Sequence, residues 1–353
     1  MKKEHILVIR FSALGDVAMA VPVVWSLAHQ YPDLRITVLS RGSSRPLFED
    51  LAPNVGFMGA DLKYEYRGLR GLNALFRRLS AKQFTGIADL HNVLRSEFLR
   101  LRFNIGHRYR VAHIDKHRKG RRLLTKKNKK QLYQQPTSFE NYIDVFSKLG
   151  YPVSIDFTSI FPPEGGNLGE LQAPFNIKGP AEHWIGIAPF AAHKGKVYPP
   201  ELMQQVIEQL TRQHPQARIL LFGRGDQEEQ WFTRWCRLFS QCLYIGQYVD
   251  NMHQELILMS HLDVMLSMDS ANMHLASLTG VPVISVWGAT HPYAGFMGWG
   301  QKAENAIQTT LECRPCSIFG QKSCHRGDYA CLYQIKPEII IDKLNTFITN
   351  KTI

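Results

Sequence analysis

The sequence predicts an α/β protein made of two similar halves, each built on a mainly parallel sheet. Short apolar runs of strand length alternate with segments of helical length through most of the chain. Residues 151–180 interrupt this alternation with nine prolines and glycines and little periodicity, and the alternation restarts after them. The 353 residues, 44% of them hydrophobic, are enough for two cores of ordinary size. We therefore expect two domains joined by a linker.

The first half opens with residues 5–10, a nearly continuous apolar run typical of a strand that is covered on both faces. A loop at 11–16 and a helix at 17–29 follow. The other elements expected here are strands at 35–40, 55–58 and 86–90, and helices at 45–51, 68–80 and 138–149. The loop contains the single Gly15, whereas the dinucleotide fingerprint requires three glycines, and no P-loop pattern is present. The sequence therefore disfavours an oxidoreductase.

The second half repeats the alternation of strands and helices. Its expected strands are 184–188, 217–222, 243–245, 262–266 and 281–287. Its expected helices are 201–214, 227–240, 251–261, a segment that ends at Gly280, and 337–348, which has proline in its first turn. We expect an N-terminal domain at 1–165, a C-terminal domain at 166–335 and a final helical segment at 336–353.

Polar side chains follow several of the expected strands. Asp16 lies after the first strand, and Lys196 follows the first strand of the second half. Asp269 and Ser270 come directly after 262–266, where a helix N-cap belongs. Ligands of open α/β sheets bind beyond the carboxyl ends of the strands, and a helix N-terminus favours an anion. We expect these residues to face a cleft between the domains, with capped helices and no ligand as the alternative.

The net charge of +12 is concentrated in one segment. Residues 107–130 contain eleven lysines and arginines against one aspartate, with almost no apolar periodicity. A solvated loop, a nucleic-acid patch and a contact with an anionic membrane or glycolipid are the alternatives. Few aromatic residues and no known motif accompany the charges, which disfavours nucleic acid. We expect residues 108–130 to contact the inner membrane, because each basic side chain near an anionic surface adds about 1 kcal/mol.

No segment of the sequence is long and apolar enough to span a membrane. The longest weakly polar run, 17–28, has 12 residues and contains Pro22. The apolar N-terminal stretch ends at Arg10, which is too short for a signal peptide, so we expect a cytoplasmic protein whose six cysteines are thiols or metal ligands. Four of them follow the spacing C-x2-C-x7-C-x6-C, namely Cys313, Cys316, Cys324 and Cys331. A structural zinc site and a cluster of buried thiols are the alternatives for this group.

Three motifs occur in order along the chain. Residues 10–16 have the pattern R-x-x-x-x-G-D at the end of the first strand, and Lys196 precedes Val-Tyr-Pro ahead of a helix. Residues 267–292 contain D-S-x-x-x-H, then G-V-P-V and a G-x-T-H-P loop. Together they resemble glycosyltransferase family 9, the ADP-heptose–lipopolysaccharide heptosyltransferases. The chain differs from the family at Ala191 and Ala192, where hydroxyl residues usually precede the phosphate lysine.

The resemblance implies a GT-B fold, in which two Rossmann-like domains face each other across a cleft and the C-terminal one holds the nucleotide sugar. It implies an inverting transfer without a metal or other cofactor, and the sequence contains no Asp-x-Asp pair of the kind that holds a metal–diphosphate. It also implies that the final helix packs back toward the first domain.

The resemblance assigns roles to individual residues. Asp16 matches the general base that takes the proton from the acceptor hydroxyl. Lys196 matches the lysine that contacts the leaving diphosphate. The remaining nucleotide-sugar residues are Asp269, Ser270 and His274, which match the motif lining the nucleotide and its phosphates, and Glu228, which matches the acid on the ribose. Arg95 and Ser96 fall where the family contacts its acidic acceptor.

The expected function is transfer of a heptose or related sugar from a nucleotide diphosphate, with ADP-heptose as the expected donor. The expected acceptor is an anionic lipopolysaccharide core or lipid-linked saccharide at the cytoplasmic face of the inner membrane. The alternative is a non-catalytic nucleotide- or glycan-binding protein on the same fold, which would bind ADP without turnover.

Overall fold

The computed structural model describes residues 4–105 and 109–348 and divides the chain into two compact units. Unit 1 consists of Met1–Lys116 and Pro136–Thr158, and unit 2 of His117–Gln135 and Ser159–Ile353. This division differs from the expected boundary after residue 165, because the chain visits unit 2 once before it leaves unit 1. In the described part of the chain, no helix has both the length and the apolar character needed to span a membrane.

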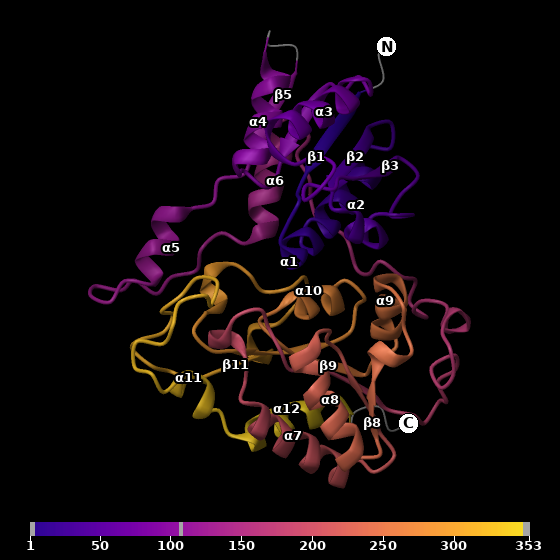
Figure 1. Ribbon diagram of the computed structural model, residues 1–353, viewed down its shortest axis with the longest axis vertical. Coiled ribbons are helices and arrows are strands. Elements are labelled where there is room, and N and C mark those ends of the chain that lie inside the picture. The colour runs from indigo at the N-terminus through magenta and orange to yellow at the C-terminus, as the bar shows by residue number, and fades with distance from the viewer. Residues whose placement is uncertain (1–3, 106–108, 349–353) are drawn as a thin grey trace. The chain divides into compact units, whose positions relative to one another are not determined.

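Unit 1 contains a five-stranded parallel sheet in the order β3-β2-β1-β4-β5 (Figure 1). The strands are β1 (His5–Ile9), β2 (Arg35–Ser40), β3 (Val55–Gly59), β4 (Gly86–Asp89) and β5 (Arg110–His113). Every residue of β1 is buried, since this strand is central and covered on both faces. The chain builds outward through β2 and β3 and then returns to β4 on the other side of β1. The strand order therefore reverses between β1 and β4, which is where open α/β sheets bind ligands.

The helices of unit 1 are α1 (Leu14–Ala18), α2 (Val21–Gln30), α3 (Gly68–Ser80), α4 (Leu94–Asn104) and α6 (Ser138–Lys148), with the 3-10 turn η1 (Gly42–Leu47). Two of these helices, α3 and α6, match the predicted ones, whereas α4 was not predicted. The single helix expected at 17–29 is divided in two, because Pro22 has no N–H to donate to the carbonyl of Ala18. The expected helix at 45–51 is the 3-10 turn η1, and β5 was not predicted.

Unit 2 contains a six-stranded parallel sheet in the order β11-β10-β9-β6-β7-β8. The strands are β6 (Trp184–Ala188), β7 (Arg218–Leu221), β8 (Cys242–Tyr244), β9 (Val264–Met268), β10 (Val283–Trp287) and β11 (Ala306–Gln308). The chain proceeds from β6 to β8 in one direction and then returns to β9 beside β6. This sheet therefore has its own reversal point, between β6 and β9. The predicted α/β class with two parallel, Rossmann-like sheets is confirmed.

The helices of unit 2 are α5 (Arg118–Leu124), α7 (Pro200–Gln213), α8 (Asp226–Leu238), α9 (Met252–Ser260), α10 (Ala271–Ser277), α11 (Ala330–Tyr333) and α12 (Pro337–Ile348). The five helices expected in unit 2 are present, and α5 and α11 occur in addition. The 3-10 turns are η2 (Leu168–Glu170), η3 (Lys194–Lys196), η4 (Ile245–Gln247), η5 (Pro292–Ala294) and η6 (Ala303–Asn305). The final helix, α12, was expected to pack toward the first domain. Its buried side chains Ile340, Ile341 and Leu344 belong to the core of unit 2, where α12 packs on α7 and β9.

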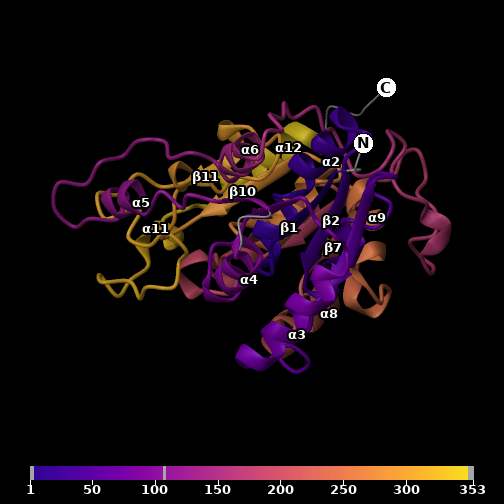
Figure 2. The same ribbon diagram turned by 90° about the horizontal axis from the view of Figure 1, so that it is seen from above.

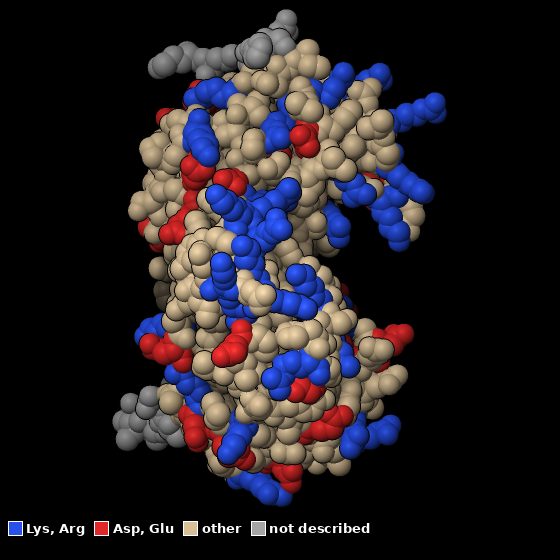
Figure 3. Space-filling model, turned by 90° about the vertical axis from the view of Figure 1, so that its left-hand side faces the viewer, with Lys and Arg blue, Asp and Glu red and all other residues tan. Residues whose placement is uncertain are grey.

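The basic segment has more structure than its charge pattern indicated. Its first part includes the edge strand β5 of unit 1, and residues 117–135, which we call the basic arm, belong to unit 2. Leu124 of α5 is fully buried, and the backbone N–H of Gln135 donates to the Tyr293 carbonyl at 2.8 Å. Figures 1 and 2 both place α5 beside the chain that leads to α11, and Figure 3 shows Lys and Arg side chains gathered on the side that carries α5.

Candidate functional site

Asp16 lies at the reversal point of the first sheet, on the first turn of the short helix that follows β1. Its carboxylate accepts a hydrogen bond from the Ala13 N–H at 3.2 Å and forms an ion pair with Arg10, the last residue before the loop. Arg10 is 8% exposed, and its guanidinium also donates to the Leu90 carbonyl beyond β4 at 2.6 Å. The ends of β1 and β4 thus hold one arginine, which in turn holds the Asp16 carboxylate. Asp16 retains 26% side-chain exposure, so solvent and ligands can reach it.

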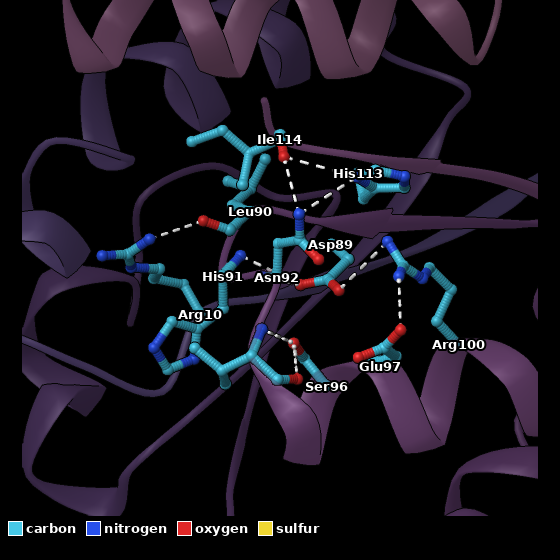
Figure 4. A network of polar contacts seen from close by, with 11 residues as sticks. Arg10, Asp89, Leu90, His91, Asn92, Ser96, Glu97, Arg100, His113 and Ile114 are labelled. Carbon is cyan, nitrogen blue, oxygen red and sulfur yellow. Dashed lines mark hydrogen bonds and ion pairs between the residues drawn. The ribbon is translucent and has the colours of Figure 1, made fainter. Parts of the chain in front are cut away.

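The turn after β4 is organised by the fully buried Asp89 (Figure 4). One carboxylate oxygen accepts from the backbone N–H groups of His91 and Asn92, at 2.9 and 2.8 Å. The other oxygen lies 3.8 Å from a guanidinium nitrogen of Arg100. Asn92 has a φ of +47°, in the left-handed region that asparagine tolerates better than most residues, and its side-chain amide donates to the Ile114 carbonyl. Asp89 and Asn92 therefore build the turn.

The two residues expected to contact the acceptor have different environments. Ser96 is fully buried, and its hydroxyl exchanges hydrogen bonds of 3.0 Å with the backbone N–H and carbonyl of Val93 (Figure 4). It thus satisfies the backbone at the start of α4, as serine commonly does at a helix N-terminus. Arg95, one position earlier, is exposed. The Arg95 side chain is thus open to solvent, whereas the Ser96 hydroxyl has its partners within the fold.

His91 is buried beside this network. The sequence showed only that His91 follows a strand. The backbone N–H of Phe11 points to its Nδ1 at 3.4 Å, and the Phe11 ring contacts the imidazole edge-on. Burial, reinforced by the positive charges of Arg10 and Lys116, lowers the pKa of His91 to about 3. His91 is therefore a neutral imidazole near the Asp16–Arg10 pair at neutral pH.

Replacing His91 by Gln is expected to make thermal stability less sensitive to acid. Below the ordinary pKa of 6.5 the unfolded chain protonates this histidine, whereas the folded protein does so only as the pH nears about 3. Neutral His91 therefore contributes its full share of the unfolding free energy above pH 6.5. This contribution is lost as the pH falls from 6.5 to about 3. Melting curves at about pH 7 and about pH 4.5 measure the effect. His29→Gln, at an exposed histidine, is the control, and equal acid sensitivity of the parent and His91→Gln would contradict the assignment.

Lys196 and Asp269 meet at the reversal point of the second sheet. Lys196 follows β6 and Asp269 follows β9, and these strands are paired in parallel. The lysine Nζ lies 3.0 Å from the Asp269 carboxylate, whose side chain is 4% exposed, while that of Lys196 is 17% exposed. The structure thus joins two residues that are 73 positions apart in the sequence. An ammonium held at this point is suited to neutralise an incoming diphosphate.

Two glycines allow the Lys196 side chain to take this position. The Gly195 carbonyl accepts from the Ala289 N–H at 2.8 Å, which ties the loop after β6 to the loop after β10. Gly320 has a φ of +81°, and a Cβ atom there would lie 2.5 Å from Cγ of Lys196. The aliphatic part of the lysine therefore packs against a backbone that only glycine leaves open.

The helix after β9 begins where the sequence indicated. Ser270 is the N-cap of α10 by its extended backbone, and its hydroxyl lies 3.3 Å from that of Ser267 rather than on the helix N–H groups. His274, one turn later, is 6% exposed. Ser270, His274 and Asp269 therefore lie on the first turn and a half that follow β9, as the D-S-x-x-x-H spacing implies.

Glu228 lies in the first turn of α8, beyond β7. Its carboxylate accepts from the backbone N–H of Arg224 at 3.1 Å, and burial raises the pKa of Glu228. Gly223 has a φ of +158°, and a Cβ at this position would overlap a carboxylate oxygen of Glu228. Gly223 is therefore required for the approach of the carboxylate to the end of β7.

Arg314 is a structural residue of this region that sequence reasoning did not identify. It is 4% exposed, and its guanidinium donates to the carbonyls of Gly288 and Thr290 after β10 and to the Gln308 side chain on β11. It also donates to the carbonyls of Trp287 and Thr309. One buried arginine thus connects the ends of two strands. In the sequence, only the position of Arg314 between Cys313 and Cys316 pointed to this structural role.

The cysteines of the C-terminal cluster are free thiols in the structure. Burial raises the pKa of Cys316, and raises that of Cys331 to about 11. Across residues 4–105 and 109–348, no three His, Cys, Asp or Glu side chains are placed together as a metal ion requires. Cys331 is thus a buried thiol, and Cys313, Cys316 and Cys324 are partly buried ones.

Comparison with known proteins decides the family. The family model described as glycosyltransferase family 9 (heptosyltransferase) matches residues 72–325. The chain belongs to glycosyltransferase family 9. A lipooligosaccharide heptosyltransferase 2 of Campylobacter jejuni is 21% identical over 348 residues, which are 96% of this chain and 96% of that protein. As a member of this family the protein is a glycosyltransferase, and its predicted enzyme class is confirmed.

Solved structures show the same fold. A family 9 glycosyltransferase from Veillonella parvula superimposes with a TM-score of 0.73 at 17% identity and covers 99% of this chain and 98% of its own. The ADP-heptose LPS heptosyltransferase II of Escherichia coli superimposes with a TM-score of 0.69 at 18% identity, covering 99% of this chain and 100% of its own. The family 9 enzyme described here thus has the GT-B class of fold along its whole length.

Proposed function

We propose that this enzyme transfers a heptose from ADP-heptose to a hydroxyl of an anionic lipopolysaccharide-type acceptor, with inversion and without a metal ion. The observation that carries the proposal is the pairing of Lys196 with the buried Asp269 at the reversal point of the second sheet. Family membership and the names of the Campylobacter and Escherichia relatives support the sugar and the nucleotide.

In the proposed reaction the acceptor oxygen attacks the anomeric carbon while the bond from that carbon to the diphosphate oxygen breaks. Asp16 takes the proton of the acceptor hydroxyl as the new bond forms. A single displacement inverts the configuration, so a second carboxylate nucleophile is not needed. The negative charge that develops on the leaving diphosphate is balanced by Lys196.

The remaining residues are proposed to bind the two substrates. Glu228 would accept hydrogen bonds from the ribose hydroxyls, and Asp269, Ser270 and His274 would line the nucleotide and its phosphates. Arg95 is proposed to contact the acidic acceptor, since its side chain is exposed after the turn built by Asp89. We propose that the reaction takes place at the cytoplasmic face of the inner membrane, where such an acceptor would be presented.

The predicted membrane contact through residues 108–130 is a separate proposal. Two of its basic residues already have partners within their own units: Arg110 donates to the Leu149 carbonyl, and Lys130 to the Glu312 carbonyl, at 2.9 and 2.8 Å. Deleting residues 116–130 should weaken association with anionic liposomes if the remaining charges provide the contact. Unchanged association would remove this part of the proposal.

A panel of nucleotides in a thermal-shift assay tests the donor. ADP is expected to raise the melting temperature more than UDP, GDP or CMP, because a ligand of the native state at about a hundred times its Kd adds roughly 3 kcal/mol. ADP-heptose with a lipopolysaccharide core acceptor is then expected to give transfer. Stabilisation by ADP without turnover would indicate the non-catalytic binding protein, and stabilisation by another nucleotide alone would overturn the donor assignment.

A further inference from the structure

A cavity of unit 2 lies between the basic arm and the loop that precedes α11. Its volume is about 700 Å³, which is within the range of small-molecule sites. Arm residues 125–130 form one wall, and residues 311–326 form the other. None of the proposed nucleotide-sugar residues lines this cavity. It is therefore a separate feature of unit 2.

The walls of the cavity carry an excess of positive charge. Lys126, Lys127 and Lys130 come from the arm, and Lys322 comes from the opposite wall. Within the described chain, Lys126, Lys127 and Lys322 have no carboxylate within ion-pair distance. Glu312 is the one acidic residue of the lining, and the lining Arg326 is already paired with Asp328 at 2.8 Å. Four ammonium groups around one cavity give it a positive potential, which favours an anion there.

The arm is held against unit 2 by contacts that do not use the exposed lysines. Lys130 donates to the carbonyls of Glu312 and Arg314, at 2.8 and 2.9 Å, and the Arg121 guanidinium lies 4.4 Å from the centre of the Phe296 ring. A Cβ atom on Gly120 would overlap the end of the Gln135 side chain, so the two ends of the arm pack closely. The arm thus has a defined course that leaves Lys126 and Lys127 exposed at the rim of the cavity.

The other lining groups are compatible with an anion. Burial raises the pKa of the Cys316 thiol, so this side chain is uncharged at neutral pH and does not compete for the lysines. Ser323 and Thr125 offer hydroxyl donors, and His325 offers a ring N–H. Lysines with a few hydroxyl donors are the usual partners of a phosphate group, whereas no Phe, Tyr or Trp on which a nucleobase could stack lines the cavity.

We propose that the cavity between the basic arm and the loop at 311–326 is a binding site for a phosphomonoester, separate from the nucleotide-sugar site. The phosphate would be contacted by Lys126, Lys127 and Lys322, with Lys130 fixing the arm. A soluble sugar phosphate and a lipid with a phosphomonoester headgroup are the two possible sources of this group. The site would let the enzyme recognise a phosphate at a distance from the reacting hydroxyl.

Two probes that share this chemistry test the proposal on the full-length protein. Glucose 6-phosphate, followed by isothermal titration, represents the soluble source, and phosphatidylcholine vesicles containing phosphatidic acid, followed by sedimentation, represent the lipid source. The double variant Lys126→Gln/Lys322→Gln is expected to weaken at least one of these interactions about tenfold or more. The interaction should also weaken as salt is raised, because the lysines are exposed.

The matched control is Lys302→Gln/Lys336→Gln, which removes two exposed lysines of unit 2 that lie outside the cavity. It is expected to change either affinity less than twofold, and melting curves of both double variants should match the parent. Equal loss in both double variants would indicate a general charge effect and overturn the proposal. Parental binding of both probes by Lys126→Gln/Lys322→Gln would overturn it as well.

A third variant separates this site from the donor site. Lys196→Met is expected to bind ADP roughly 10- to 100-fold more weakly and to keep the binding of glucose 6-phosphate or phosphatidic acid vesicles. Parallel loss of both ligands in Lys196→Met would place the phosphate in the nucleotide site and overturn the proposal. A parent protein that fails to bind ADP but binds the phosphomonoester through the arm lysines would disprove the proposed donor and leave this site established.

Discussion

Replacing Asp16 by Asn is expected to reduce sugar transfer by about a thousandfold while ADP binding is retained. The amide keeps the volume of the side chain but cannot take a proton from the acceptor hydroxyl, and loss of a general base typically costs 10²- to 10⁴-fold, roughly. The carboxylate is 26% exposed and fixed by Arg10 and the Ala13 N–H, so the substitution removes its chemistry rather than the core. Single-turnover transfer and an ADP thermal shift measure the two properties separately.

Asp33→Asn is the matched control, because it removes an exposed aspartate from the same unit. Its transfer rate should equal that of the parent. The assignment of the base would be wrong if Asp16→Asn transferred sugar at the parental rate. A variant that lost ADP binding along with activity would point to a general structural defect, which the melting curve would reveal.

Replacing Lys196 by Met is expected to lower both donor affinity and stability. The diphosphate loses a charged partner, which corresponds to roughly a 10- to 100-fold weaker ADP complex. The Asp269 carboxylate, whose side chain is 4% exposed, loses the lysine 3.0 Å away, and an uncompensated buried charge costs about 3 kcal/mol. ADP titration and chemical denaturation measure the two effects.

A double variant separates these consequences. Lys196→Met/Asp269→Asn is expected to recover most of the lost stability, since the buried charge is removed, while ADP binding remains weak. Lys194→Met is the control, because this exposed lysine lies in the same turn and contacts the Tyr329 ring rather than a carboxylate. Recovery of ADP affinity in the double variant would show that Lys196 acts only by pairing with Asp269.

Much of the fold could be predicted from local pattern. The strands at 35–40, 55–58 and 86–90, and the helices at 68–80 and 337–348, match the observed elements within one residue at each end. They were predictable because continuous apolar runs of strand length and amphipathic helical periods are local properties of the chain. The helix break before Pro22 and the 3-10 turn η1 were missed, since these depend on backbone hydrogen bonds rather than on hydrophobic pattern.

Segments with few apolar residues were the least predictable. The edge strand β5 and the helix α5 lie in the stretch that reads as a charged loop. Strand β5 pairs with β4, and Arg121 of α5 packs on the Phe296 ring, which is distant in the sequence. The role of Arg314 also depends on tertiary contacts, because its five hydrogen-bond acceptors lie at the ends of two strands. The helix or strand propensity of a segment does not reveal such partners, because these segments are stabilised by tertiary contacts.

The sequence alone determined the alternation of strands and helices, the break between two halves and the residue types placed after each strand. These follow from hydrophobic period and from motif spacing, which act over a few residues. The tertiary structure decided which strand ends are adjacent, and hence that Arg10 holds Asp16 and that Lys196 meets Asp269. Strand order is set by the packing of whole helices on both faces of a sheet, so pairs that are 73 residues apart become visible only once the sheet is assembled.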